Sequence, residues 1–224
     1  MVILCDFDDT AADRNVATLL LNHFQPVPFS AGAPHWRELH QRYLGAEITL
    51  ADYQETAFAQ MRSSQEEQAA YVKEKAALRP GFVELAGYCA DHGIELAIVS
   101  HGLDFYVRAL LEESGLEELP FFAVHTNETD GRTSFTYRFS SEACDWFPGN
   151  CKCHIIEKYR EPGQMVLYAG DGISDTCPAR KADYVFARDG LLSFCRAQGI
   201  PHLELTDFHV VLDYVRSLPA DMTP

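Results

Sequence analysis

The residues best suited to chemistry stand at the start of the chain, where an apolar run stops abruptly at acidic residues. Residues 1–10 read MVILCDFDDT, which places Asp6, Asp8 and Asp9 directly after the run. We expect a buried strand that delivers these carboxylates to its C-terminal end. Because side chains alternate along an extended strand, Asp6 and Asp8 would face the same way. One carboxylate could then attack a substrate while its neighbour handles a proton. An acidic turn after an edge strand is the alternative that these ten residues leave open.

Acids this close together also need positive charge. Neighbouring carboxylates repel one another and are costly to remove from water, so such a cluster usually has a compensating cation. Oxygen ligands suit a hard divalent ion such as Mg²⁺. The sequence therefore predicts a magnesium site near Asp6 and Asp8.

Composition narrows the class of protein and of partner. The chain has 224 residues, of which 47% are hydrophobic, and a formal net charge of -15. This acidity argues against nucleic acid or an anionic membrane as partner, but a small phosphorylated ligand fits if positive charge gathers locally. No apolar run approaches the roughly 20 residues of a spanning helix. Seven cysteines without framework spacing, and no signal-peptide pattern, favour a reducing, cytoplasmic setting.

A helical block follows the first acidic residues. Apolar periodicity predicts helices within residues 11–24, 35–44, 49–61 and 64–78. The pairs Thr49/Asp52 and Ser64/Glu67 are typical of helix N-caps with an acid three residues on. We expect residues 13–78 to form a helical cap domain, inserted between the first strand and the rest of a sheet.

Beyond Arg79-Pro80-Gly81, helices and short β-rich runs alternate. This pattern indicates an α/β fold with a Rossmann-like parallel sheet covered by helices on both faces, built from residues 1–12 and 79–224. Ligands of such sheets bind beyond the carboxyl ends of the strands. The expected strands are 94–99, 121–124, 165–169, 184–187 and 202–205, with a hairpin around 130–131; the expected helices are 82–92, 103–113, 153–159, 191–198 and one ending near 218.

Polar residues follow the strand ends in a definite order. Ser100 follows the second strand, Lys152 precedes the helix expected at 153–159, and Gly170-Asp171-Gly172-Ile173-Ser174-Asp175 follows the strand at 165–169. Together with Asp6-Phe7-Asp8-Asp9-Thr10, this set resembles the haloacid dehalogenase superfamily, whose phosphatases carry Asp-x-Asp-x-Thr/Val, a Ser/Thr, a Lys and Gly-Asp-x-x-x-Asp. The resemblance spans most of the chain and respects both order and strand placement.

The resemblance implies an Mg²⁺-dependent phosphatase that acts on a small phosphorylated metabolite through an aspartyl phosphate. Attack on a phosphate dianion by a carboxylate requires a cation that neutralises the phosphoryl oxygens. The roles carried over residue by residue are these: Asp6 as nucleophile and metal ligand, Asp8 as acid/base and as metal ligand through its carbonyl, Ser100, His101, Gly102 and Lys152 as phosphate-binding groups, and Asp171 and Asp175 as metal ligands.

Specificity should come from the cap, because the core handles only the phosphoryl group. A helical cap right after the first motif resembles the phosphoserine phosphatases, whereas residues 100–105, the Cys-Lys segment and residues 185–189 look most like the methionine-salvage phosphatases that act on a methylthiopentenyl phosphate. Phosphoethanolamine/phosphocholine phosphatases are similar in the same places. Phosphoserine ranks lower because Asp13-Arg14-Asn15 stands where those enzymes typically place an amine-binding Glu. A phosphomutase or a noncatalytic phosphate-binding protein are the remaining alternatives.

Several residues keep a second interpretation. Ser100 and Asp175 could each serve only as a helix N-cap. Cys144, Cys151 and Cys153, with His154, could hold zinc, although the Cys-x-Cys spacing is unusual. Asp9 stands where superfamily members often carry a small residue, and the resemblance gives its extra charge no role.

Overall fold

The first strand lies at the centre of the fold. The computed structural model describes residues 1–25, 33–129, 132–144 and 147–219. Within these ranges a seven-stranded sheet has the order β4-β3-β2-β1-β5-β6-β7, and every neighbouring pair is parallel except β3 with β4. The α/β prediction is confirmed, and the edge-strand alternative for residues 1–10 is wrong. The strands are β1 (Val2–Cys5), β2 (Glu95–Leu103), β3 (Phe121–Thr129), β4 (Arg132–Thr136), β5 (Val166–Gly170), β6 (Tyr184–Ala187) and β7 (His202–Glu204).

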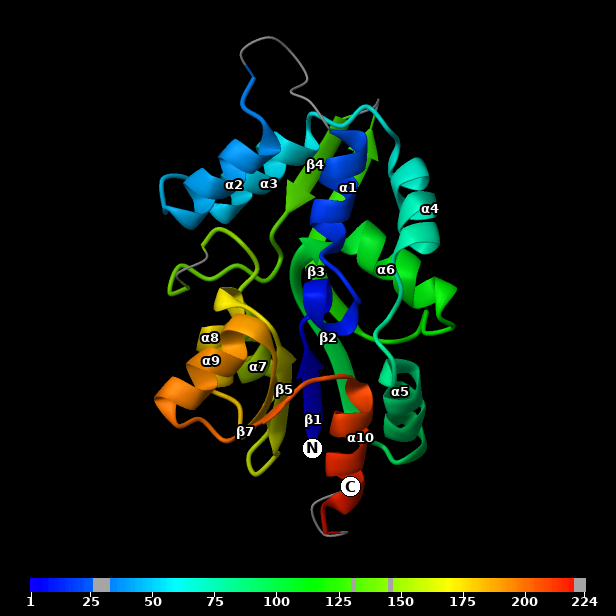
Figure 1. Ribbon diagram of the computed structural model, residues 1–224, viewed down its shortest axis with the longest axis vertical. Coiled ribbons are helices and arrows are strands. Elements are labelled where there is room, and N and C mark those ends of the chain that lie inside the picture. Colours follow the sequence, from blue (N-terminus) through cyan, green and yellow to red (C-terminus); the bar gives the residue numbers. More distant parts are fainter. Residues whose placement is uncertain (26–32, 130–131, 145–146, 220–224) are drawn as a thin grey trace.

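Both faces of the sheet are covered because both sets of alternating side chains are apolar. Val2 and Leu4 pack with α7, whereas Ile3 and Cys5 pack with the cluster that includes α5, α6 and α10, and all four side chains are fully buried. Figure 1 shows α5 and α10 on one side of β1 and α7, α8 and α9 on the other. These helices are α5 (Phe82–Asp91), α6 (Asp104–Glu113), α7 (Lys152–Tyr159), α8 (Thr176–Ala179), α9 (Asp189–Gln198) and α10 (Phe208–Ser217).

Among the described residues between β1 and α5, the chain forms the four predicted helices α1 to α4, and Figure 1 shows α1 to α3 beyond the end of β1. Both expected capping boxes are present, with Thr49 and Asp52 closing the start of α3, and Ser64 and Glu67 that of α4. The apolar residues of the four helices belong to the same hydrophobic cluster as those of α5, α6 and α10. The helices are α1 (Val16–Phe24), α2 (Trp36–Leu44), α3 (Leu50–Phe58) and α4 (Gln65–Lys75).

Several boundaries differ from the sequence-based expectation; β3, for example, runs to Thr129 instead of ending near residue 124, and two differences lie beside the expected site. The helix expected from residue 11 begins at Val16, because Phe7–Ala11 forms a separate tight turn and the Asn15 side chain accepts a hydrogen bond from Thr18 N as the cap of α1. Strand β2 continues to Leu103 instead of ending near residue 99. The acidic residues therefore lie in a turn past the end of β1. Residues 130–131, where the hairpin turn was expected, lie outside the described ranges.

The two chain segments that link α1–α4 to the sheet run antiparallel. Ala12 and Leu78 form an isolated β-bridge, Arg79 N donates to Ala11 O at 2.7 Å, and Asp13 N donates to Ala77 O at 2.9 Å. The entry and exit of the helical segment are thus fixed to each other next to the acidic turn. In the described ranges, none of the helices has the length and apolar character needed to cross a membrane.

Candidate active site

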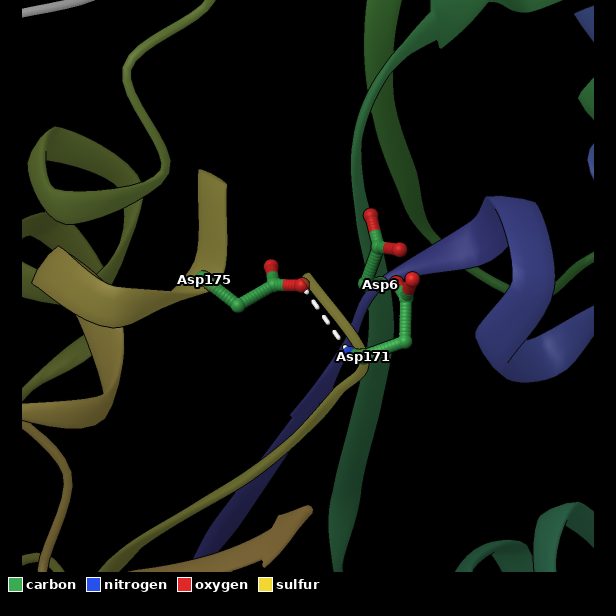
Figure 2. A group of neighbouring side chains, drawn as sticks. All are labelled: Asp6, Asp171 and Asp175. Atoms are coloured by element: carbon green, nitrogen blue, oxygen red, sulfur yellow. Dashed lines mark hydrogen bonds between the residues drawn. The ribbon is translucent and has the colours of Figure 1, made fainter. Parts of the chain in front are cut away.

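Three carboxylates meet at the carboxyl edge of the sheet. Asp6 follows β1, Asp171 follows β5, and Asp175 ends the short helix η2 (Ile173–Asp175). One oxygen from each lies within 4.8 Å of the others, and Figure 2 shows Asp6 and Asp171 together with Asp175 reaching toward them from the side. Because β1 and β5 are paired parallel neighbours, their ends bring Asp6 and Asp171 together, as the sequence predicted.

Lys152 supplies the buried positive charge of this cluster. It is the first residue of α7 and is 2% exposed. Its Nζ donates to Asp6 Oδ1 at 2.5 Å and to Asp175 Oδ1 at 2.6 Å. The fold therefore places Lys152 among the carboxylates, although its sequence surroundings are not diagnostic.

Asp175 is fully occupied by hydrogen-bond donors. Its Oδ1 accepts from Lys152 Nζ and, at 2.5 Å, from the Tyr168 hydroxyl, while its Oδ2 accepts from the backbone N–H groups of Asp171 and Gly172. Burial opposes its ionisation, but Lys152 and the other donors outweigh burial and hold its pKa below the usual value. Its side chain makes no cap hydrogen bond to the following helix α8, so the N-cap alternative does not describe its role; its bond from Gly172 N closes the start of η2.

The charge of Lys152 compensates Asp6 only in part, and Asp171 has no ion pair among the described residues. Burial, aided by the charge of Asp175, raises the pKa of Asp6 well above its usual value even though Lys152 opposes the shift, and the same two causes raise the pKa of Asp171 to about 6. The Thr10 hydroxyl lies 3.3 Å from Asp6 Oδ2 and 3.1 Å from Asp171 Oδ1. Three acids around one ammonium form an oxygen-only donor set with excess negative charge, which fits a hard divalent cation.

Asp8 has partners different from those of Asp6. Its Oδ1 accepts from Val16 N at 2.7 Å and Ala17 N at 3.3 Å, and its Oδ2 accepts from the Tyr106 hydroxyl at 2.9 Å. The alternation expected for this pair assumes that Asp6 and Asp8 lie on one extended strand. This assumption is wrong, because β1 ends at Cys5. Burial raises the pKa of Asp8 to about 6, although the hydrogen bonds from Tyr106, Val16 and Ala17 work in the other direction.

The backbone explains Asp9. Its φ of 62° lies in the left-handed region, where glycine is unstrained and aspartate is better tolerated than most residues. Its carbonyl, with those of Thr10 and Ala12, accepts a hydrogen bond from the Arg79 guanidinium.

Ser100, His101 and Gly102 form the end of β2. Ser100 is 1% exposed, and its Oγ accepts from Gly102 N at 2.8 Å; it lies within the strand, so it is not the N-cap of α6. Burial lowers the pKa of His101 to about 3, which keeps its imidazole neutral. The His101 carbonyl accepts from Gln54 Nε2 of α3 at 2.6 Å, so the helical segment contacts the C-terminal part of β2 directly.

Comparison with known proteins places the chain in a family. Residues 1–198 match the family described as Putative Phosphatase. The chain belongs to this phosphatase family. It is 28% identical to the 2-hydroxy-3-keto-5-methylthiopentenyl-1-phosphate phosphatase of Brevibacillus brevis, over 99% of this chain and 98% of that protein. It is 31% identical to the protein of the same name from Geobacillus kaustophilus, over 97% and 96% of the two chains.

Solved structures show the same fold. The structure titled as a phospho-aspartyl intermediate analogue of phosphoserine phosphatase superposes with a TM-score of 0.65 at 17% identity, covering 95% of this chain and 97% of that one. A phosphoserine phosphatase from T. onnurineus gives a TM-score of 0.64 at 17% identity, with 97% and 95% covered. The haloacid dehalogenase fold expected from the motifs is thus confirmed, and the protein is a phosphatase.

The structure gives the cysteines of this phosphatase other partners than zinc. Cys151 Sγ accepts from His154 N as the cap of α7, and Cys153 Sγ lies 2.7 Å from Cys177 Sγ of α8. In the part of the chain that the structure describes, the only group of three or more acid, cysteine or histidine residues placed to hold a metal is the aspartate cluster. The zinc interpretation therefore has no support among these residues.

Sequence reasoning missed four residues of the phosphatase site. Tyr106 and Tyr168 are buried and bind Asp8 and Asp175, respectively. Gln54 of α3 reaches the C-terminal part of β2, and Arg79 binds the acidic turn. No local motif marks them, since each partner is distant in sequence or reached only through the fold. The one available signal was Arg79, which stands beside the Pro80-Gly81 break where the helical block ends.

Proposed function

We propose that this phosphatase hydrolyses a small phosphorylated metabolite with Mg²⁺, through a phosphoryl group carried transiently on Asp6. The observation that carries the proposal is the cluster of Asp6, Asp171 and Asp175 at the carboxyl edge of the sheet, in which buried Lys152 pairs with Asp6 and Asp175. A ring of acids with one ammonium is poorly stabilised alone and is well suited to a cation together with a phosphate.

The hydrogen bonds of the acids distinguish those that would bind Mg²⁺ directly from the one that would position other groups. Asp6 and Asp171, with the main-chain carbonyl of Asp8, would hold Mg²⁺, which would neutralise phosphoryl oxygens and orient the group for attack. Asp175 already accepts four hydrogen bonds, so it would act through water and by holding Lys152 and the loop after β5.

The residues of the chain account for both halves of the reaction. A carboxylate oxygen of Asp6 attacks phosphorus, the ester P–O bond breaks, and Asp8 gives its proton to the departing alkoxide. Asp8 then takes a proton from the water that attacks the aspartyl phosphate, which releases phosphate and restores Asp6. Lys152, Ser100 and the backbone N–H groups near Gly102 would hold phosphoryl oxygens.

For the substrate we propose 2-hydroxy-3-keto-5-methylthiopentenyl 1-phosphate. Full-length similarity to phosphatases of that name supports this choice. Phosphoserine, the substrate in the names of the structural neighbours, is the alternative, but Arg14 and Asp13 pair with each other at 2.8 Å where an amine-binding acid was expected. Phosphoethanolamine, phosphocholine and phosphoryl transfer to a second substrate are further outcomes for a screen to separate.

The first prediction concerns metal dependence and the nucleophile. Phosphate release from p-nitrophenyl phosphate should require Mg²⁺, stop with EDTA and resume when Mg²⁺ is restored. Asp6→Asn should abolish turnover while circular dichroism stays unchanged. Turnover that ignores EDTA, or full activity in Asp6→Asn, would refute the proposal. Initial rates over the candidate metabolites then rank the substrates, and product analysis distinguishes free phosphate from phosphoryl transfer.

A further inference from the structure

A buried tyrosine that the reaction scheme does not use touches the proposed acid/base. Tyr106 lies on α6 and is fully buried. Its hydroxyl donates to Asp8 Oδ2 at 2.9 Å. In the proposed reaction Asp8 must gain and lose a proton, so the Tyr106 hydroxyl binds a group whose protonation changes.

The partners of Asp8 restrict where that proton can sit. A carboxylate offers about four lone-pair positions, two on each oxygen. Both positions on Oδ1 are taken by the N–H groups of Val16 and Ala17 at the start of α1. Tyr106 takes one position on Oδ2. The position that remains for a transferable proton is the second one on Oδ2.

The packing at Gly102 independently supports the contact between Tyr106 and Asp8. A Cβ atom at Gly102 would lie 2.1 Å from the Tyr106 hydroxyl and 2.8 Å from Asp8 Oδ2. Both separations are far below normal contact distances, so any side chain here would push the tyrosine and the carboxyl apart. The absence of a side chain at Gly102 leaves the space in which Tyr106 and Asp8 meet.

We propose that Tyr106 is a positioning residue that confines the transferable proton of Asp8 to one site on Oδ2. The proposal rests on the acid/base role proposed for Asp8. It has a specific kinetic consequence. A misplaced proton slows cleavage only where the leaving group needs that proton, so the loss should depend on leaving-group basicity.

Two substrates of similar shape test this dependence. Phenyl phosphate releases a strongly basic phenolate, whereas p-nitrophenyl phosphate releases a weakly basic one. In Tyr106→Phe, we expect kcat/KM for phenyl phosphate to fall about 10-fold further than kcat/KM for p-nitrophenyl phosphate. The quantity to compare is the ratio of the two constants, because it covers only steps up to ester cleavage and cancels any loss of folded enzyme.

Two variants make the result decisive. Tyr168→Phe removes a buried hydroxyl from a different carboxylate, Asp175, and should leave the substrate ratio unchanged even if both rates fall. Asp8→Asn removes the acid itself and should shift the ratio more than Tyr106→Phe does. A shift in Asp8→Asn but none in Tyr106→Phe overturns the role of Tyr106 alone. An unchanged ratio in Asp8→Asn overturns the acid/base role and the inference together, and an equal shift in Tyr168→Phe overturns the inference.

Discussion

Lys152 provides the positive charge that balances the buried carboxylates of the site. Its ammonium contacts both Asp6 and Asp175, and all three side chains are almost completely buried. Removing one partner from a buried ion pair leaves the other charges without compensation, which costs far more than losing a surface pair. The same residue would also bind the phosphoryl group, so stability and catalysis depend on one side chain.

The second prediction follows from this burial. Lys152→Gln should lower the free energy of unfolding by about 3–5 kcal/mol and abolish phosphatase activity, because two buried carboxylates lose their counter-charge. The matched control is Lys181→Gln, which removes an exposed pair with Glu157 and should cost less than about 1 kcal/mol. Urea unfolding without Mg²⁺ measures both. Equal losses in the two variants would show that the buried network contributes little.

The third prediction concerns Asp9, whose backbone rather than charge explains its position. Asp9→Val should lower the free energy of unfolding by about 1–2 kcal/mol, because a β-branched residue is strained at a positive φ. Asp9→Gly should stay within about 1 kcal/mol of the parent and retain turnover of p-nitrophenyl phosphate. Thermal and urea unfolding separate the two. A Gly variant as damaged as the Val variant would instead assign a role to the carboxylate.

The acidic turn and the chain segments linking it to the helices are held by one side chain. The Arg79 guanidinium donates to the carbonyls of Asp9, Thr10 and Ala12 at 2.9, 3.0 and 3.3 Å. Asp8 lies within the same turn, and its carboxylate binds the start of α1. Arg79 therefore couples the geometry of the acid/base to the junction between the sheet and the helical segment.

The fourth prediction tests this coupling. Arg79→Lys keeps the charge but loses the planar fork, so the carbonyls are left partly unsatisfied. We expect the free energy of unfolding to fall by about 1–3 kcal/mol, and kcat to fall more than KM changes. Arg160→Lys, in an exposed ion pair with Asp183, is the control that should behave like the parent. An unchanged kcat in Arg79→Lys would separate the junction from catalysis.

Local patterns predicted the secondary structure where local energetics decide it. The capping boxes at Thr49 and Ser64 and the continuous apolar strands are examples, because their hydrogen bonds or burial follow from neighbouring residues. The start of α1 and the end of β2 were missed. At both places, contacts with residues outside the element determine the boundary. Asp8 accepts a hydrogen bond from the N-terminus of α1, and β2 pairs with β3 as far as Leu103.

The site was predictable to the extent that strand ends converge in a parallel sheet. That rule placed Asp6, Ser100 and Asp171 at one edge, and the motif resemblance added Lys152 and Asp175. The contacts of Tyr106, Tyr168 and Gln54 were not predictable, since the hydroxyls and amide act on atoms that only the folded chain brings near. The catalytic motif can be read locally, but the groups that orient it cannot.

One face of the sheet, the helices α5, α6 and α10 and the helical segment share one hydrophobic cluster, whereas α7, α8 and α9 pack in separate clusters. We propose that residues 13–78 act as a cap over a core of residues 1–12 and 79–224. The paired linkers at Ala12 and Leu78 and the Gln54 contact to the C-terminal part of β2 support this division. A protein with a net charge of -15 repels a phosphate dianion on the whole. We therefore propose that the buried ammonium of Lys152, together with a bound cation, attracts the dianion to the site.

The central claim is that the phosphoryl group passes through Asp6. The fifth prediction is its direct measurement: the enzyme is mixed with Mg²⁺ and p-nitrophenyl phosphate, quenched in acid within one turnover, digested, and analysed by mass spectrometry. The account predicts one phosphoryl group on the peptide of residues 1–14, located at Asp6 and absent from Asp6→Asn. A phosphoryl group on another residue, or none at any time while p-nitrophenol is released, would contradict it.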